Sequence, residues 1–285
     1  MVVTLNFSIA EAIEFAGNRL VSGDGGRLEA ERLLAYLLKV ERSYLYAWSD
    51  RRLTPTQWVS FQRLLQRRAK GEPLAYIRGW QEFWSLNLQV TEATLIPRPE
   101  TEQVVELALQ RLDLERALNV ADLGTGSGAI ALAMGSERPR ARVIATDVSA
   151  ETLEVARENG RRLGLCNVTF RLGDWFVPLV GERFHLIASN PPYIAEGDPH
   201  LTQNGLAFEP DIALIAKDKG LGAARHIAMT AREHLLDGGW LLLEHGYEQG
   251  PSLLALFTQL GYQQVADFCD LAGLPRVVAG QWRAC

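Results

Sequence analysis

Short runs of apolar residues alternate with amphipathic segments from residue 117 to the end of the chain. A short apolar run bounded by turn residues is typical of a buried strand, and apolar residues that recur every three to four positions are typical of a helix. This pattern predicts strands at 117–123, 142–147, 168–172, 184–189, 239–245, 262–268 and 276–281. It predicts helices at 101–112, 129–136, 150–163, 221–236 and 250–260. The alternation predicts an α/β fold with a doubly wound, mostly parallel sheet of seven strands.

Residues 8–71 have the periodicity of helices instead. Ser8 followed by Glu11 forms a capping-box sequence, and leucines recur at helical spacing from residue 28 to residue 38. Thr54 and Pro55 supply a further helix start, with a stop at Gly71. We interpret residues 1–72 as a small helical bundle for substrate docking; a stability or oligomerisation module is the alternative.

Aromatic and alternating residues replace the helical pattern at 76–90, which predicts a β-hairpin. We place this hairpin in a linker over residues 73–95, so that the α/β domain covers residues 96–285.

Composition narrows the class of protein. The 285 residues are 47% hydrophobic and 22% charged, with a net charge of −5, which is typical of a globular chain. No apolar run approaches the roughly 20 residues of a membrane-spanning helix, and no secretory signal pattern is present. Residues 1–80 carry a net charge of +4 and the rest −9, which disfavours an extended nucleic-acid track. We therefore expect a cytoplasmic protein that does not bind the membrane and does not act directly on nucleic acid.

The cysteines and histidines show no pattern typical of a metal site. Three cysteines far apart fit neither a disulfide framework nor a thiolate cage, so we expect reduced thiols. The histidines lack ligand spacing, and we expect no metal; they are His185, His200, His226, His234 and His245.

A glycine-rich loop follows the first predicted strand of the sheet. Its residues are Gly124, Thr125, Gly126, Ser127 and Gly128. Glycines there allow a sharp turn and close approach of a ligand to the helix N-terminus. Asp147 ends the next strand, about where an acid reaches ribose hydroxyls in dinucleotide folds. No Lys-Ser/Thr pair follows the loop, which excludes a P-loop NTPase, but a nicotinamide dehydrogenase and an S-adenosylmethionine methyltransferase both remain open.

The fourth predicted strand runs directly into Asn190, Pro191, Pro192 and Tyr193. The prolines fix the backbone and remove two N–H donors, so this loop presents mainly acceptors: the Asn190 side-chain oxygen and the Pro191 carbonyl. A planar NH₂ group suits these acceptors, with its plane against the Tyr193 ring and its nitrogen facing an electrophile. A rigid turn without chemistry is the alternative interpretation.

At these residues the sequence resembles the class I methyltransferases that act on planar nitrogens, whose hallmark is an Asn/Asp-Pro-Pro-aromatic loop. Over nearly the whole chain it resembles the release-factor glutamine methyltransferases (PrmC/HemK family). The further matching segments are 83–86, 95–102, 208–210 and 243–246.

The resemblance implies a class I, Rossmann-like methyltransferase domain over residues 96–285, which transfers a methyl group from S-adenosylmethionine. The implied acceptor is the side-chain amide nitrogen of the glutamine in the Gly-Gly-Gln motif of bacterial class I peptide chain release factors, release factors 1 and 2. Residues 124–128 would hold the methionine part of the cofactor, Asp147 the ribose and Trp175 the adenine. Residues 190–193 would bind the glutamine, and Asn190 would also contact the cofactor.

Three other functions compete with this one. An N6-adenine or other exocyclic-amine methyltransferase acting on RNA or DNA would use the same acceptor loop. A nicotinamide enzyme would use the same sheet edge. A helical adaptor with a degenerate methyltransferase fold would keep the fold without its chemistry.

Overall fold

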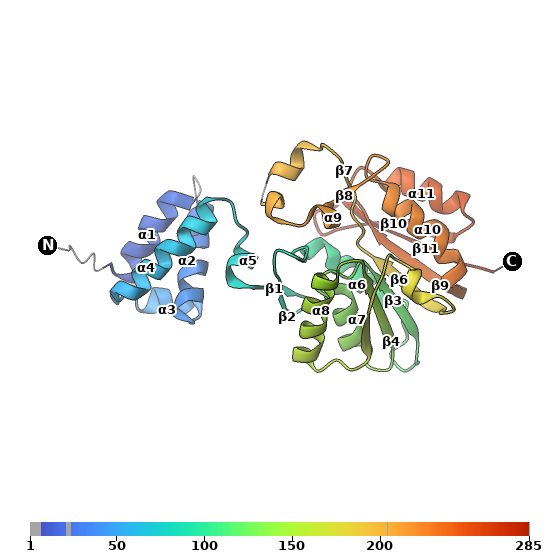
Figure 1. The fold of residues 1–285 in the computed structure, drawn as a ribbon, viewed down its shortest axis with the longest axis horizontal. Coiled ribbons are helices and arrows are strands. Elements are labelled where there is room, and N and C mark those ends of the chain that lie inside the picture. The colour runs from blue at the N-terminus through green and yellow to red at the C-terminus, as the bar shows by residue number, and fades with distance from the viewer. Residues whose placement is uncertain (1–6, 21–23, 204, 285) are drawn as a thin grey trace. The chain divides into compact units, whose positions relative to one another are not determined.

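The computed structural model describes residues 7–20, 24–203 and 205–284 and divides the chain into two compact units (Figure 1). The first unit is Met1–Gly79 and the second is Trp80–Cys285. Among the described residues, no helix combines the length and apolar character needed to cross a membrane.

The described part of the first unit is helical, as predicted. Its helices are α1 (Ile9–Leu20), α2 (Asp24–Leu38), α3 (Arg42–Ala47), α4 (Pro55–Ala69) and α5 (Leu74–Arg78). The capping box of α1 is present: Ser8 N–H donates to Glu11 Oε2 at 2.7 Å, and Glu11 N–H donates to Ser8 Oγ at 3.2 Å. Thr54 and Gln57 form the same motif at α4. The core of this unit includes Leu33, Leu34 and Phe61, all fully buried.

The hairpin lies later in the chain than predicted. Residues 76–78 belong to α5, so the prediction of a strand there is wrong; Gly79, in a left-handed conformation, ends this helix. The two strands are β1 (Trp80–Phe83) and β2 (Leu86–Gln89), which pair antiparallel.

Seven strands form the main sheet of the second unit, as predicted. Their order is β10-β11-β9-β6-β3-β4-β5, and only β11 opposes its neighbours. The strands are β3 (Asn119–Leu123), β4 (Arg142–Asp147), β5 (Val168–Leu172), β6 (Phe184–Ser189), β9 (Leu235–Glu244), β10 (Gln263–Cys269) and β11 (Pro275–Gln281). The doubly wound α/β fold is confirmed.

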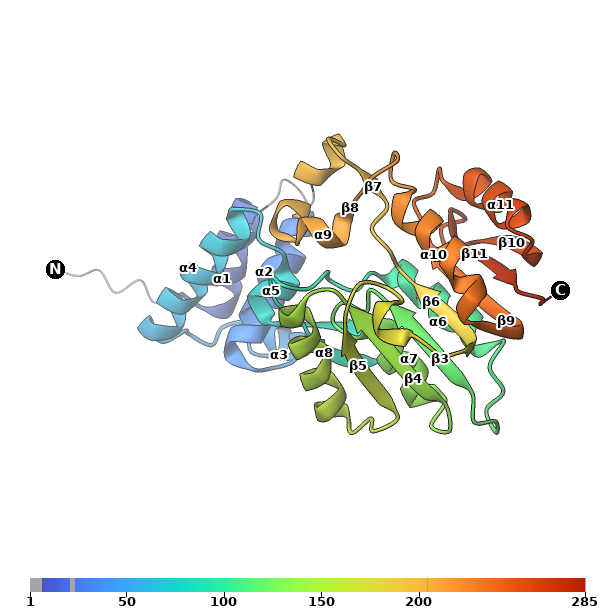
Figure 2. The same ribbon diagram turned by 45° about the vertical axis from the view of Figure 1, so that its right-hand side comes forward.

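Helices cover both faces of this sheet (Figure 2). One apolar core packs β1 and β2 with α6 and α7 against one face, and α8 lies beside α7. A second core packs α10 and α11 against the other face. The helices are α6 (Glu102–Leu109), α7 (Ala129–Glu137), α8 (Ala150–Leu163), α10 (Gly222–His234) and α11 (Gly250–Gln259). The two apolar faces account for the continuous hydrophobic runs of β3 and β6.

The order of the strands fixes where a ligand can bind. From β3 the chain moves outward through β4 and β5, and then returns to the other side of β3 with β6 and β9. In open α/β sheets, ligands bind at the carboxyl ends of the strands beside such a reversal. The glycine-rich loop follows β3 and the Asn-Pro-Pro-Tyr loop follows β6, so both predicted motifs lie at this reversal.

Candidate active site

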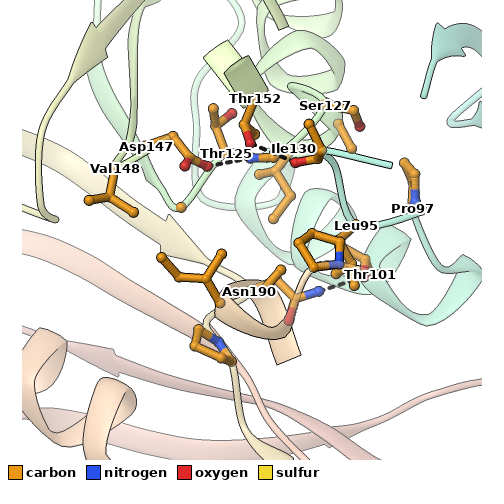
Figure 3. A pocket seen from close by; sticks show the side chains of 18 of the residues that line it. Leu95, Pro97, Thr101, Thr125, Ser127, Ile130, Asp147, Val148, Thr152 and Asn190 are labelled. Atoms are coloured by element: carbon orange, nitrogen blue, oxygen red, sulfur yellow. Dashed lines mark hydrogen bonds between the residues drawn. The ribbon is translucent and has the colours of Figure 1, made fainter. Parts of the chain in front are cut away.

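A cavity of about 400 Å³ opens at this edge of the sheet (Figure 3). Most of the predicted cofactor-binding residues line it: Gly124, Thr125, Gly126, Ser127, Asp147, Trp175 and Asn190. Gly128 does not line the cavity; it is the N-cap of α7, with a positive φ of 90°. The structure therefore brings together residues from four separate strand ends, at a volume typical of a small-molecule site.

The cavity wall needs glycine at position 124. Gly124 has a φ of 68°, and a Cβ built on it would lie 3.1 Å from Cζ3 of Trp175. The Trp175 indole therefore packs directly against the loop backbone, and Trp175 itself has a positive φ of 42°. Thr146 Oγ1 donates to the Trp175 carbonyl at 3.0 Å and fixes this turn.

Asp147 joins the glycine-rich loop to the next strand–helix connection. Its Oδ2 accepts the Gly126 N–H at 3.0 Å, and its Oδ1 accepts the Ser149 N–H at 3.0 Å. Burial raises the pKa of Asp147, while its N–H donors act in the opposite direction. The carboxylate is thus oriented from the protein side and borders the cavity.

Asp122 holds the glycine-rich loop from beneath, a role that the sequence analysis did not assign. It is fully buried, and its Oδ2 accepts the Thr125 hydroxyl at 2.6 Å and the Ala131 N–H at 3.1 Å. Burial raises its pKa to about 7. These bonds fix the start of α7, on which the loop depends.

Asn190 borders two cavities. Its Nδ2 donates to Thr101 Oγ1 at 3.2 Å, as Figure 3 shows, so one of the two N–H groups of the amide is already bonded. The side-chain oxygen is the end of the amide left to accept from a ligand. Beyond Asn190 lies a second cavity of about 240 Å³, whose polar side chains are Arg98, Glu100, Tyr193, Glu244 and Arg276.

The rest of the Asn-Pro-Pro-Tyr loop divides between the two cavities. Pro192 lines the first cavity and Tyr193 lines the second. Pro191 is buried and lines neither of them, so the predicted acceptor role of its carbonyl stays a prediction. The Tyr193 carbonyl accepts from Gln249 Nε2 at 3.0 Å. A Cβ on Gly220 would lie 2.2 Å from this carbonyl oxygen, so the loop is held closely from both sides.

Glu209 fixes the segment opposite this loop. Its Oε2 accepts the Ile96 N–H at 3.0 Å, and its Oε1 pairs with the Arg98 guanidinium. The side chain of Glu209 is buried, so it stabilises the turn that leads through Pro97 and Pro99 to Thr101. The segment 208–210, singled out by resemblance alone, therefore has a structural reason: it positions the cavity walls formed by Pro97 and Pro210.

The second cavity contains buried groups whose pKa values are raised. Burial raises the pKa of Glu244 to about 7, and the Thr101 hydroxyl, which donates to its carboxylate, acts in the opposite direction. Burial also raises the pKa of Tyr193, with Glu244 contributing. The Glu244 Oε2 atom has no hydrogen-bond partner among the described residues. A cavity with two carboxyls, two guanidinium groups and a phenol suits a polar, peptide-like ligand.

His245 has a structural contact. It is buried at the end of β9, where Nε2 lies 3.0 Å from Asp267 Oδ1 and Nδ1 lies 2.9 Å from the Gly246 carbonyl oxygen. In the part of the chain that the structure describes, no group of three or more His, Cys, Asp and Glu side chains is arranged around a metal position.

The chain matches two family models and many curated relatives. The models are PrmC N-terminal domain, over residues 11–79, and Methyltransferase small domain, over residues 98–206. The release factor glutamine methyltransferase of Vibrio cholerae is 47% identical over 282 residues, which cover 98% of each chain. That of Xylella fastidiosa (strain Temecula1) is 51% identical over 255 residues, 90% of this chain and 93% of the relative.

One solved structure supports the fold. A methyltransferase from Pyrococcus furiosus superposes with a TM-score of 0.51 at 20% identity, over 79% of this chain and 99% of its own. At that identity the superposition shows the class I methyltransferase architecture alone. The sequence relatives, close to half identical over nearly their full length, show more: the chain belongs to the release factor glutamine methyltransferase family.

Proposed function

We propose that this enzyme methylates the side-chain amide nitrogen of the glutamine in the Gly-Gly-Gln motif of class I peptide chain release factors 1 and 2. The methyl donor is S-adenosyl-L-methionine, which leaves as S-adenosyl-L-homocysteine. The observation that carries the proposal is the position of Asn190, which borders both cavities and is bonded to Thr101 through its amide nitrogen and not its oxygen. The reaction takes place in the cytoplasm, where translation occurs.

The first cavity fits this cofactor. Ser127 lines it and has a buried hydroxyl oxygen without a hydrogen-bond partner among the described residues, as expected of a group that meets a ligand. The loop N–H groups at the start of α7 suit the methionine carboxylate, Asp147 the ribose hydroxyls and the Trp175 ring the adenine. When bound, the cofactor supplies an electrophilic methyl group on a positively charged sulfur.

The second cavity and the Asn-Pro-Pro-Tyr loop bind and orient the substrate amide. An amide nitrogen is a poor nucleophile because its lone pair is delocalised into the carbonyl. Asn190 Oδ1 and the Pro191 carbonyl each accept one N–H, which stabilises the positive charge that develops on nitrogen. Pro192 and Tyr193 confine the plane of the amide, so that the nitrogen is directed at the methyl group.

We propose that the helical unit docks the release factor. Residues 1–80 carry a net charge of +4 on a chain that is otherwise acidic, and exposed Tyr46 and Trp48 offer aromatic contacts on this unit. Such groups favour a folded protein partner with acidic surface.

The function is tested by methyl transfer from labelled S-adenosylmethionine to purified release factors 1 and 2, with tRNA, rRNA and DNA as parallel substrates. We expect label in the glutamine of the Gly-Gly-Gln motif, located by mass spectrometry, and its loss when that glutamine is replaced. Label in nucleic acid and none in the release factors would identify an exocyclic-amine methyltransferase and overturn the proposal.

Replacing Asp147 by alanine is expected to weaken binding of S-adenosylmethionine about tenfold, because charged hydrogen bonds to the ribose are lost. Calorimetric titration with the cofactor measures this change. Asp218→Ala, at an exposed position outside the cavity, is the matched control and should bind as the wild type does. Equal affinity in Asp147→Ala and wild type would contradict the ribose assignment.

A further inference from the structure

The hydroxyl of Thr101 contacts Asn190 instead of capping a helix. Thr101 occupies the N-cap position of α6, where a threonine hydroxyl ordinarily accepts a backbone N–H of the first turn. Here the side chain makes no such capping bond. Its Oγ1 accepts from Asn190 Nδ2 at 3.2 Å, and the same hydroxyl lowers the pKa of Glu244, as a donor to an ionised carboxylate does. The residue is 3% exposed, so water does not compete for these bonds.

The chemistry of the three groups gives this chain of hydrogen bonds a direction. A carboxylate has only acceptor atoms, and a threonine hydroxyl has a single hydrogen. While Glu244 is ionised and takes that hydrogen, Oγ1 can only accept from Asn190, in agreement with the 3.2 Å contact from Nδ2. Below the pKa of Glu244, about 7, the protonated carboxyl is itself a donor to Oγ1 and this constraint is lost. An acceptor at this position selects the NH₂ end of the Asn190 amide and leaves the oxygen for the cavities.

We propose that Thr101 is a positioning residue that determines which end of the Asn190 amide faces the substrate nitrogen. This inference rests on the proposed function, because the orientation matters only if Asn190 Oδ1 accepts from a substrate NH₂ group. An asparagine with its amide reversed would present a donor to that NH₂ group, and the substrate would be repelled from the reactive position.

The backbone around Thr101 is held firmly enough for this role. Thr101 ends a short 3₁₀ helix, η1 (Pro99–Thr101), and its N–H donates to the Arg98 carbonyl at 3.1 Å. Arg98 is paired with buried Glu209, which also accepts the Ile96 N–H. At the other end of the chain of hydrogen bonds, Glu244 lies on β9, next to β6, whose last residue precedes Asn190. The turn at η1 thus fixes Thr101, and strand β9 fixes Glu244.

The experiment compares Thr101→Val, which keeps the shape and loses the hydroxyl, with Thr101→Ser, which restores the hydroxyl. We expect Thr101→Val to lower kcat for release-factor methylation roughly 10- to 100-fold, with the Kd for S-adenosylmethionine unchanged within about twofold. Thr101→Ser should recover kcat to within about threefold of wild type. Thr258→Val removes an exposed threonine hydroxyl on α11 and is the matched control, expected to keep wild-type kcat.

A second readout needs no substrate and so separates this inference from the proposed function. The side-chain NH₂ signals of Asn190 are identified in an amide NMR spectrum by their absence from Asn190→Ala. In Thr101→Val these hydrogens should exchange with solvent about tenfold faster than in wild type, and Thr101→Ser should restore slow exchange. Unchanged Asn190 signals in Thr101→Val would overturn the positioning role. Wild type that fails to methylate release factors, with signals that respond as expected, would overturn only the proposed function.

Discussion

Replacing Asn190 by alanine is expected to lower kcat for release-factor methylation about 10³-fold, because the acceptor that stabilises the charge developing on the substrate nitrogen is lost. The Kd for S-adenosylmethionine should change less than about threefold, because the expected cofactor contacts of the loop, Asp147 and Trp175 remain in the first cavity. Labelled methyl transfer under saturating cofactor measures kcat, and calorimetry measures the Kd.

The matched control is Asn87→Ala, which removes an exposed asparagine of β2 in the same unit and should retain full activity. Normal turnover in Asn190→Ala would remove the mechanism. Parallel loss of cofactor binding would mean instead that Asn190 serves the first cavity, and the assignment of its oxygen to the substrate amide would be wrong.

Hydrophobic periodicity was sufficient to predict the sheet. The bounds of β4, β5, β6 and α8 coincide with those predicted from the sequence, because each is a clear apolar run or amphipathic segment between turn residues. The start of β9 was predicted at residue 239 but lies at Leu235, directly after α10. Gly238 and Gly239 are ordinarily breakers, yet here they lie inside a strand whose pairing with β6 is irregular.

The site was predictable where its residues follow one another in the chain. The glycine-rich loop and Asn190 each lie at a strand end, so local pattern and sheet topology together place them at one edge. Thr101, Asp122 and Glu244 carry no local signal, because their roles depend on side-chain contacts between segments far apart in the sequence. Segments 95–102 and 243–246, which contain Thr101 and Glu244, match the family, but the resemblance did not indicate what these two side chains do.

The buried carboxyl of Asp122 lowers the free energy of unfolding as pH rises, and this effect can be measured. Burial raises the pKa of Asp122 to about 7, whereas an unfolded aspartate titrates near 3.9. Between these values the folded chain holds a proton that the unfolded chain has released, so the free energy of unfolding falls as pH rises, by about 1.4 kcal/mol per pH unit. This loss is complete above about pH 7, where the carboxyl is ionised in both states.

Asparagine does not titrate, so Asp122→Asn lacks this pH-dependent loss. The free energy of unfolding of Asp122→Asn minus that of wild type is therefore expected to increase by about 2 kcal/mol from pH 5.5 to pH 8. Asp122 Oδ1 has no hydrogen-bond partner among the described residues. If the asparagine amide nitrogen takes its place, the free-energy cost is the same at both pH values and does not affect this increase. Glu244, whose pKa burial also raises, is common to both chains and cancels as well. Hydrogen exchange of β3 amides in a urea series measures the second unit alone.

Asp113→Asn makes the same substitution at an exposed position and is the matched control, expected to keep the wild-type dependence of stability on pH. A stability difference between Asp122→Asn and wild type that stays constant from pH 5.5 to pH 8 would show that Asp122 titrates alike in the folded and unfolded chains. The carboxyl would then be ionised while it holds Thr125 and Ala131 throughout this range. A difference that grows with pH would mean that the loop accepts a protonated carboxyl, whose remaining acceptor oxygens are enough to fix the start of α7.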